Sequence, residues 1–281
     1  MHIGYHQSER LIKLTKTVLF MLIGVAFLIP LAWMISASLK TPSEIFQRDF
    51  HWLPEVPRWD NYKYIWSESE ANMATGYLNS AFITIVSIVV SLAFASVAAY
   101  AFAKIEFKGK NFVFMLFLST MMIPTEVTLV PRFMLFNYIG LYNNHWAIIL
   151  PNWFAPSAIF MLRQFYMGLP NDLMEAAKID GANHARIFAQ VMMPLTKAAL
   201  VSQCVLTFVH CWNDYMAPLI FLIKKNLFTV SQVIQWTLLD EAVRTDLTMA
   251  AATTAILPVV IIFMFCQRYF VEGIATSGVK G

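Results

Sequence analysis

The chain has 281 residues, of which 58% are hydrophobic and only 13% are charged. A soluble domain carries about 25% charged residues, so this composition excludes an ordinary soluble protein and indicates a helical membrane protein. The formal net charge of +3 is accounted for by the excess of cations on the inner side of membrane proteins, so it calls for no nucleic-acid partner.

Long uncharged windows predict the membrane spans, because a helix needs about 20 apolar residues to cross the hydrocarbon core and must satisfy its own backbone hydrogen bonds there. Six windows qualify in chain order: 17–39, 71–103, 111–125, 133–162, 198–223 and 247–267. The fourth window is longer than one span, and its span is expected to be centred on 146–160. The third is short and runs into Pro124 and Glu126, and the fifth contains one acid, Asp214. The predicted fold is all-α and polytopic, with six transmembrane helices in a single domain over 1–281.

The first window also imitates a cleavable signal peptide, because basic residues precede it and Ser36-Ala37-Ser38 follow it. A signal peptide has an apolar core of about 7–15 residues, and this run is longer. We therefore expect an uncleaved first span.

Lysine and arginine placement predicts the orientation, since inner loops carry the excess of cations. With the N-terminus inside, most cations fall on inner segments, including the three lysines of the short 104–110 loop. Both termini are then expected in the cytoplasm, the 37–79 loop outside, and the 167–197 loop in the cytoplasm.

Three cysteines, Cys204, Cys211 and Cys266, fall in or near predicted spans. An odd number at this spacing suggests neither a disulfide framework nor a metal site. We expect them to be small packing residues.

A polar island at 175–183 interrupts the apolar chain between the fourth and fifth windows. Asp172 is a candidate helix cap with Glu175 three residues on, and Gly181 is expected to end this short helix. A second helix is predicted over 184–192, stopping at Pro194. The island then forms an elbow with small residues at its centre, which another surface can approach closely; an ordinary amphipathic linker remains the alternative.

The island resembles the EAA motif of ABC-transporter permeases. The matching residues are Glu175-Ala176-Ala177, Gly181, Ile187-Phe188 and Pro194-Leu195. Met122-Ile123-Pro124, Val130-Pro131, Arg163-Gln164-Phe165 and the run from Trp212-Asn213-Asp214 to Ala217-Pro218-Leu219 are similar to the carbohydrate-uptake, maltose-type group, and within it to the six-span second permease. Two departures, Met193 for leucine and Ala198 for proline, leave the bend into the fifth span open.

The resemblance implies a type I ABC importer permease fold in a bacterial or archaeal cytoplasmic membrane. Implied partners are the lipid membrane, a second homologous permease, two copies of a cytoplasmic ATPase subunit and an extracytoplasmic sugar-binding protein. The chain has no phosphate-loop motif, so we expect it not to be an enzyme, with ATP and Mg bound by the ATPase partners. Implied ATPase-docking residues are Asp172, Glu175, Ala176, Ala177, Asp180 and Gly181. Two outer segments, 41–70 and 224–246, are expected to offer contacts to the binding protein.

Ionisable residues inside a span are candidates for a substrate path. The predicted path residues are Trp212, Asn213, Asp214 and Tyr215, since an aromatic ring beside amide and carboxylate groups suits a sugar. Asp214 could instead pair with a cation of the partner permease. Two further roles stay open. Glu126 could face the path or lie at the membrane interface, and His210 could relay protons or serve as a packing residue.

The predicted function is therefore the permease subunit of an ATP-driven, binding-protein-dependent importer of sugars, oligosaccharides in particular. Two alternatives remain. One is an ion-coupled secondary transporter with His210 and Asp214 as its relay, and the other is an ABC permease for a polyol such as glycerol phosphate.

Overall fold

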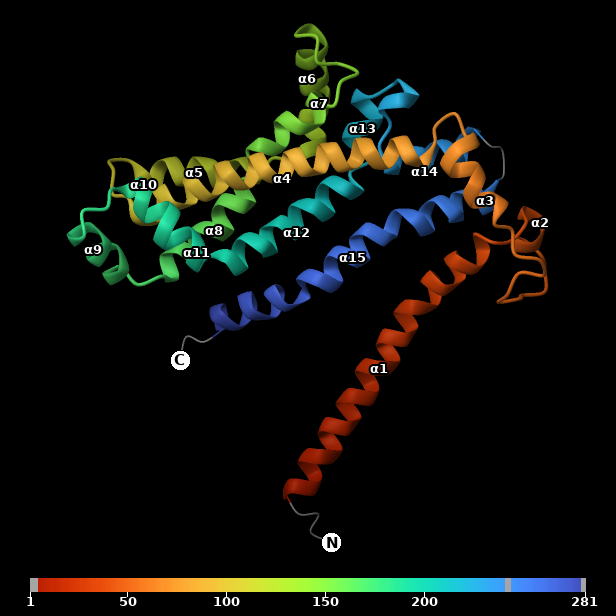
Figure 1. Ribbon diagram of the computed structural model, residues 1–281, viewed down its shortest axis with the longest axis horizontal. Coiled ribbons are helices and arrows are strands. Elements are labelled where there is room, and N and C mark those ends of the chain that lie inside the picture. Colours follow the sequence, from red (N-terminus) through yellow and green to blue (C-terminus); the bar gives the residue numbers. More distant parts are fainter. Residues whose placement is uncertain (1–4, 241–243, 279–281) are drawn as a thin grey trace. The chain divides into compact units, whose positions relative to one another are not determined.

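The computed structural model describes residues 5–240 and 244–278, and these form helices and loops with no strand. Figure 1 labels most of these helices along the chain. The described residues divide into two compact units. One unit runs to Ser69 and includes Ile234–Thr254, and the other consists of Glu70–Val233 and the chain from Ala255 onward.

The first unit begins with one long helix, α1 (Tyr5–Ala37). Its apolar side chains are mostly exposed within the unit, as expected of a helix that meets lipid or another subunit. Three short helical segments follow: α2 (Pro42–Ile45), α3 (Asp60–Lys63) and the π-helix η1 (Tyr64–Glu68).

The segment after α1 folds back on the last turns of that helix. The buried Lys40 ammonium lies 4.5 Å from the centre of the Trp33 ring and donates a hydrogen bond to the carbonyl of His51. Asn61 donates from its side chain to the carbonyl of Ser38 at 2.9 Å and to that of Lys40 at 3.3 Å. These contacts fix the loop to the end of the first span.

The second unit is built around α4 (Met73–Lys104), whose first turn is capped by the Asn72 side chain, an acceptor for the Thr75 amide at 2.9 Å. Its buried face carries mainly small residues: Gly76, Ser80, Thr84, Ser87, Ser91, Ala95, Ser96 and Ala99. Small side chains let helices approach closely in a membrane. This face packs against α8 (Pro156–Gly168) and α12 (Lys197–Asn213).

The remaining helices of the chain are shorter or bent, apart from the last one. They are α5 (Lys110–Thr120), α6 (Thr125–Tyr138), α7 (Trp146–Ile149), η2 (Leu150–Trp153), α9 (Asp172–Ile179), α10 (His184–Ile187), η3 (Phe188–Met192), α11 (Met193–Leu195), α13 (Met216–Phe221), η4 (Lys225–Leu227), α14 (Val230–Asp240) and α15 (Thr245–Gly278).

The prediction of a polytopic helical membrane protein is confirmed, while its count of six spans is approximate. Among the described residues, three helices are long and apolar enough to cross a membrane: Ile12–Ala37, Met73–Lys104 and Thr245–Arg268. The number rises to at most five if each of two bent pairs is counted as one span: α5 with α6, bent by 90°, and the 184–195 helices with α12, bent by 77°. The 77° bend shows that the chain does bend as it enters the fifth span, although Ala198 stands where the resembling group often has proline.

The fourth predicted span is wrong as a single helix. The window 133–162 contains the end of α6, then α7 and η2, and the first half of α8. Pro151 and Pro156 explain the breaks, because each lacks a backbone amide and fixes its own backbone angle. Proline at the first turn of η2 and of α8 starts a new helix rather than continuing the old one.

Gly76 supplies a first testable prediction. A side chain there would begin 3.0 Å from a methyl group of Val233 and 3.4 Å from the Val230 amide nitrogen. We expect Gly76→Val to destabilise the protein by about 1–3 kcal/mol, the usual cost of overpacking, seen as a lower Tm in detergent. Gly24→Val is the matched control, since Gly24 has nothing within 4 Å. Equal Tm values for the two variants would contradict the close packing of α4.

Candidate functional site

The elbow, defined here as residues 171–192, consists of α9, the turn that follows it, and the helical segments α10 and η3. Gly181 has a φ of +78°, in the left-handed region that glycine adopts without strain. The Ala182 amide donates to the Ala177 carbonyl at 2.9 Å, which closes the end of α9. The Asn183 side chain then accepts from the Arg186 amide at 2.9 Å and starts α10. The turn predicted at Gly181 is present.

The expected capping pair of Asp172 and Glu175 is wrong. The residue before the first turn is Asn171, and no side chain caps α9. The Asn171 side-chain oxygen is already used, because it accepts a hydrogen bond from the Lys104 ammonium at 2.7 Å. Asp172 and Glu175 both lie in the first turn of α9, where carboxylates interact favourably with the helix dipole.

The second elbow helix also differs from its prediction over 184–192. Only His184–Ile187 is α-helical; the chain then winds as the π-helix η3 and returns to α-helix over Met193–Leu195. Pro194 falls at the start of α11 rather than ending a helix. Proline has no backbone amide to donate, and the first turn of a helix does not require one.

One face of the elbow is anchored in the unit and the other is exposed. Met174, Ile187 and Met192 are buried in one apolar cluster with Leu162 and Tyr166. Of the six predicted docking residues, Asp172, Glu175, Ala176, Asp180 and Gly181 are exposed and Ala177 is half-buried. The structure thus places the predicted docking residues together along α9 and the turn that follows it, and five of the six are accessible.

Two exposed apolar residues, Leu173 and Ile179, belong to the same helix. Ile179 is 86% exposed and Leu173 is 41% exposed. Their neighbour Met174 faces inward and is buried, so α9 has one large apolar residue in the core and two in contact with solvent. Ile179 is not among the predicted docking residues, although it lies beside them; the signal in the sequence was an isoleucine at the last position of a short polar helix.

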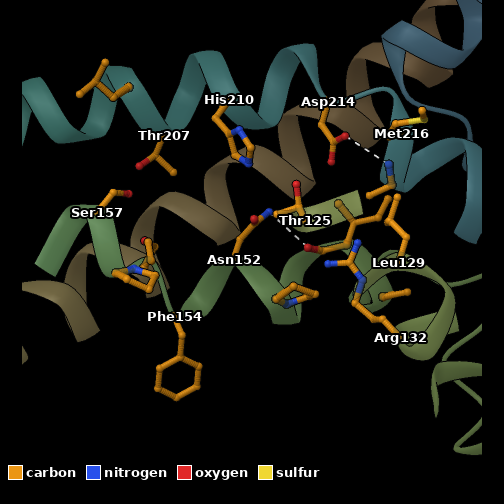
Figure 2. Close-up of a pocket in the computed structure, with 18 of the residues that line it drawn as sticks. Thr125, Leu129, Arg132, Asn152, Phe154, Ser157, Thr207, His210, Asp214 and Met216 are labelled. Carbon is orange, nitrogen blue, oxygen red and sulfur yellow. Dashed lines mark hydrogen bonds between the residues drawn. The ribbon is translucent and has the colours of Figure 1, made fainter. Parts of the chain in front are cut away.

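A cavity of about 580 Å³ lies among α6, the α7–η2 segment, α8, α12 and α13 (Figure 2). Its lining mixes apolar side chains with polar ones. The polar and charged residues of the lining are Ser91, Thr125, Glu126, Arg132, Asn152, Ser157, Gln203, Thr207, His210 and Asp214. Such a mixture offers hydrogen-bond donors and acceptors to a polar ligand, with apolar surface between them.

Asp214 enters this cavity because α12 ends at Asn213 and α13 starts at Met216. One Asp214 carboxylate oxygen accepts from the Ala217 amide at 3.2 Å, which caps α13. Figure 2 shows His210 and Asp214 on one wall, with Asn152 and Arg132 on the facing one. The Arg132 guanidinium lies 5.1 Å from the centre of the Phe221 ring.

The other predicted path residues lie outside the lining. Trp212 is 4% exposed, stacks on Phe208 with ring centres 5.5 Å apart and donates from its ring nitrogen to the Ala255 carbonyl at 3.0 Å. The exposed Asn213 donates back to the Val209 carbonyl at 2.9 Å. Helix geometry gives the reason: residues four apart share a face, so His210 accompanies Asp214 while Trp212 turns away.

Glu126, whose role the sequence left open, lines the cavity together with Arg132 and His210. Cys211 is buried, Cys204 and Cys266 are half-buried, and all three thiols are free. Within the described part of the chain, no cluster of three or more His, Cys, Asp or Glu residues could hold a metal ion.

Comparison with known proteins gives the family. Residues 91–276 match the family described as "Binding-protein-dependent transport system inner membrane component". A relative from Halalkalibacterium halodurans, the arabinooligosaccharides transport system permease protein AraQ, is 37% identical over 267 residues, which cover 94% of this chain and 95% of the relative. The sn-glycerol-3-phosphate transport system permease protein UgpE of Pectobacterium atrosepticum is 31% identical, over 92% of this chain and 94% of its own.

A solved structure shares the fold. It is the crystal structure of a bacterial ABC transporter involved in the import of the acidic polysaccharide alginate, one chain of which superposes with a TM-score of 0.81 at 24% identity. The match covers 96% of this chain and 100% of that one. This chain therefore belongs to the family of inner membrane components of binding-protein-dependent transport systems, and it has the fold of an ABC importer permease.

Proposed function

We propose that this chain is the permease subunit of an ATP-driven importer that takes sugar, oligosaccharide in particular, from an extracytoplasmic binding protein. The observation that carries the proposal is the elbow: five of its six predicted docking residues are exposed along α9 and its C-terminal turn, while the other face of the elbow is buried. Such a turn suits a docking partner, and the chain's sequence has no phosphate loop with which to use ATP itself.

The elbow receives force from the ATPase. A carboxylate-bearing first turn, small residues at Ala176 and Gly181, and the apolar Ile179 together fit a cleft on a cytoplasmic ATPase subunit. Two ATPase subunits bind ATP with Mg, and their closure moves this elbow and the one on a second, homologous permease. In this arrangement the elbow and both termini lie in the cytoplasm, as the lysine-rich 104–110 loop favours.

The cavity is this subunit's part of the sugar path. Asp214 and Asn152 present hydrogen-bonding groups for sugar hydroxyls, and the second permease supplies the opposite side. The charged groups of the lining are two carboxylates, Glu126 and Asp214, and one guanidinium, Arg132. An excess of carboxylate disfavours a phosphorylated solute by like-charge repulsion, so a neutral sugar is preferred to glycerol phosphate.

The energy source separates this proposal from a proton-driven carrier that uses His210 and Asp214. The complete complex, reconstituted in liposomes, is supplied either with ATP and no ion gradient or with a proton gradient and no ATP. We expect sugar uptake only with ATP, and none when the ATPase subunit is replaced by a variant unable to hydrolyse it. Uptake driven by the gradient alone would contradict the proposed function.

A further inference from the structure

Both sides of the elbow are tied to the last two turns of α4. The Lys104 ammonium donates to the Leu169 carbonyl and to the Asn171 side-chain oxygen, each at 2.7 Å, just before α9 begins. One turn earlier on α4, the Tyr100 hydroxyl is hydrogen-bonded to the His184 Nδ1 atom at 3.0 Å, just after the elbow's turn. Positions 100 and 104 share a helix face, so one surface of α4 holds the entry and the exit of α9.

The other end of α4 holds a second loop, 224–230, between α13 and α14. The Asn79 side chain donates to the carbonyls of Asn226 and Phe228, each at 2.9 Å. The Ser80 hydroxyl accepts from the Val230 amide, also at 2.9 Å.

An ion pair adds to this attachment. Lys225 donates to Glu70, two residues before the cap of α4, and this hydrogen bond holds the pKa of the Glu70 carboxyl below its usual range. Both groups are exposed to water, so the ion pair is a minor contribution. The amide of Asn79 and the hydroxyl of Ser80 are the main attachments.

Between its two ends, α4 is one uninterrupted helix. About 38 Å of helix separates Asn79 from Lys104, at about 1.5 Å per residue. Its small buried residues pack against α8 and α12 along this length, and it has no proline inside, so it lacks the usual cause of a kink. A helix packed in this way moves as a rigid body.

We propose that α4 is a rigid link that couples the 224–230 loop to the elbow, with Lys104, Tyr100 and Asn79 as the positioning residues that attach it. The inference rests on the proposed function, in which the elbow docks on the ATPase, and on the expectation from the sequence that the outer 224–246 segment contacts the binding protein. Seating of the loaded binding protein against the loop then shifts α4, and its shift reaches the ATPase through the two sides of α9.

The test measures ATP hydrolysis by the complete complex in lipid nanodiscs, with and without the sugar-loaded binding protein. Lys104→Met and Asn79→Leu each remove one attachment without a large change in volume. We expect each to lower the ratio of stimulated to basal hydrolysis by at least about fivefold, the low end of coupling between sites, while the ATPase still co-purifies. Tyr100→Phe, which removes a single oxygen atom, is the second variant at the elbow end and is expected to lower the ratio in the same direction.

Two matched variants serve as controls. Lys110→Met removes a neighbouring lysine whose ammonium pairs with Glu106 at 3.0 Å rather than with the elbow. Asn72→Ala removes the cap of α4 but not its link to the loop. Both are expected to keep the wild-type ratio.

A double variant separates one link from two independent contacts. If α4 transmits a single motion, Lys104→Met with Asn79→Leu lowers the ratio no further than the more severe single variant, since the two changes interrupt one route. Wild-type ratios in both single variants, or losses that multiply in the double variant, would overturn the inference. A wild-type complex that retains no ATPase would contradict the proposed function instead.

Discussion

Gly181→Trp is expected to release the ATPase from the complex while the chain still inserts and folds. Gly181 has a φ of +78° and nothing within 4 Å of an added Cβ atom, so a larger side chain starts in open space on the face where the partner is proposed to dock. The left-handed backbone costs about 1–2 kcal/mol for a residue other than glycine. We expect at least a tenfold loss of co-purified ATPase, as about 1.4 kcal/mol of lost binding already corresponds to tenfold.

Gly109→Trp is the control for backbone strain. Gly109 has a φ of +83°, also has nothing within 4 Å, and lies in the turn before α5 rather than in the elbow. Both variants put tryptophan at a left-handed backbone position, but only Gly181→Trp does so in the elbow. Equal retention of ATPase by both would contradict docking at the elbow, as would a normal yield of complex with Gly181→Trp.

Asp214→Asn is expected to reduce sugar uptake at least about tenfold while the complex stays assembled. Asparagine still offers a side-chain oxygen to the Ala217 amide, so the start of α13 is kept. What is lost is the charged acceptor in the cavity, and hydrogen bonds to charged groups are worth about 1.5–3 kcal/mol. The measurement is initial uptake rate against sugar concentration in liposomes with saturating ATP.

Two further variants separate an effect on the sugar path from an effect on the stability of the fold. Asp214→Ala removes both the charge and the cap, so it is expected to lower the Tm as well as uptake. Asn213→Ala changes the adjacent residue, whose side chain is exposed outside the cavity and returns to the Val209 carbonyl, and should transport normally. Unchanged uptake with Asp214→Asn, or an equal loss with Asn213→Ala, would contradict a path through this cavity.

The spans that the sequence predicts well are those formed by one continuous helix. The windows 17–39, 71–103 and 247–267 are each long and apolar enough for composition alone to predict a membrane-spanning helix. The window 133–162 has the same composition but is broken at Pro151 and Pro156. A count of apolar residues cannot tell a broken segment from a straight one, because the breaks depend on single backbone positions.

The candidate site divides in the same way. The turn at Gly181 could be predicted because a left-handed backbone favours glycine. The start of α9 could not be predicted. The residue at its N-cap position, Asn171, accepts a hydrogen bond from Lys104, which is distant in the sequence, and so does not cap the helix. Trp212 and Asp214 are neighbours in sequence, yet only Asp214 lines the cavity, and this follows from how α12 rotates against its packing partners.

The central claim is that the elbow is the ATPase-docking surface, and a photo-crosslinker at Ile179 tests it most directly. Ile179 is 86% exposed on α9, and Phe112 on α5 is the control at 64%. With the crosslinker at Ile179 in the assembled complex, we predict one product that contains the ATPase subunit, and with the crosslinker at Phe112 none. Crosslinking of the ATPase from Phe112 but not from Ile179 would contradict the account.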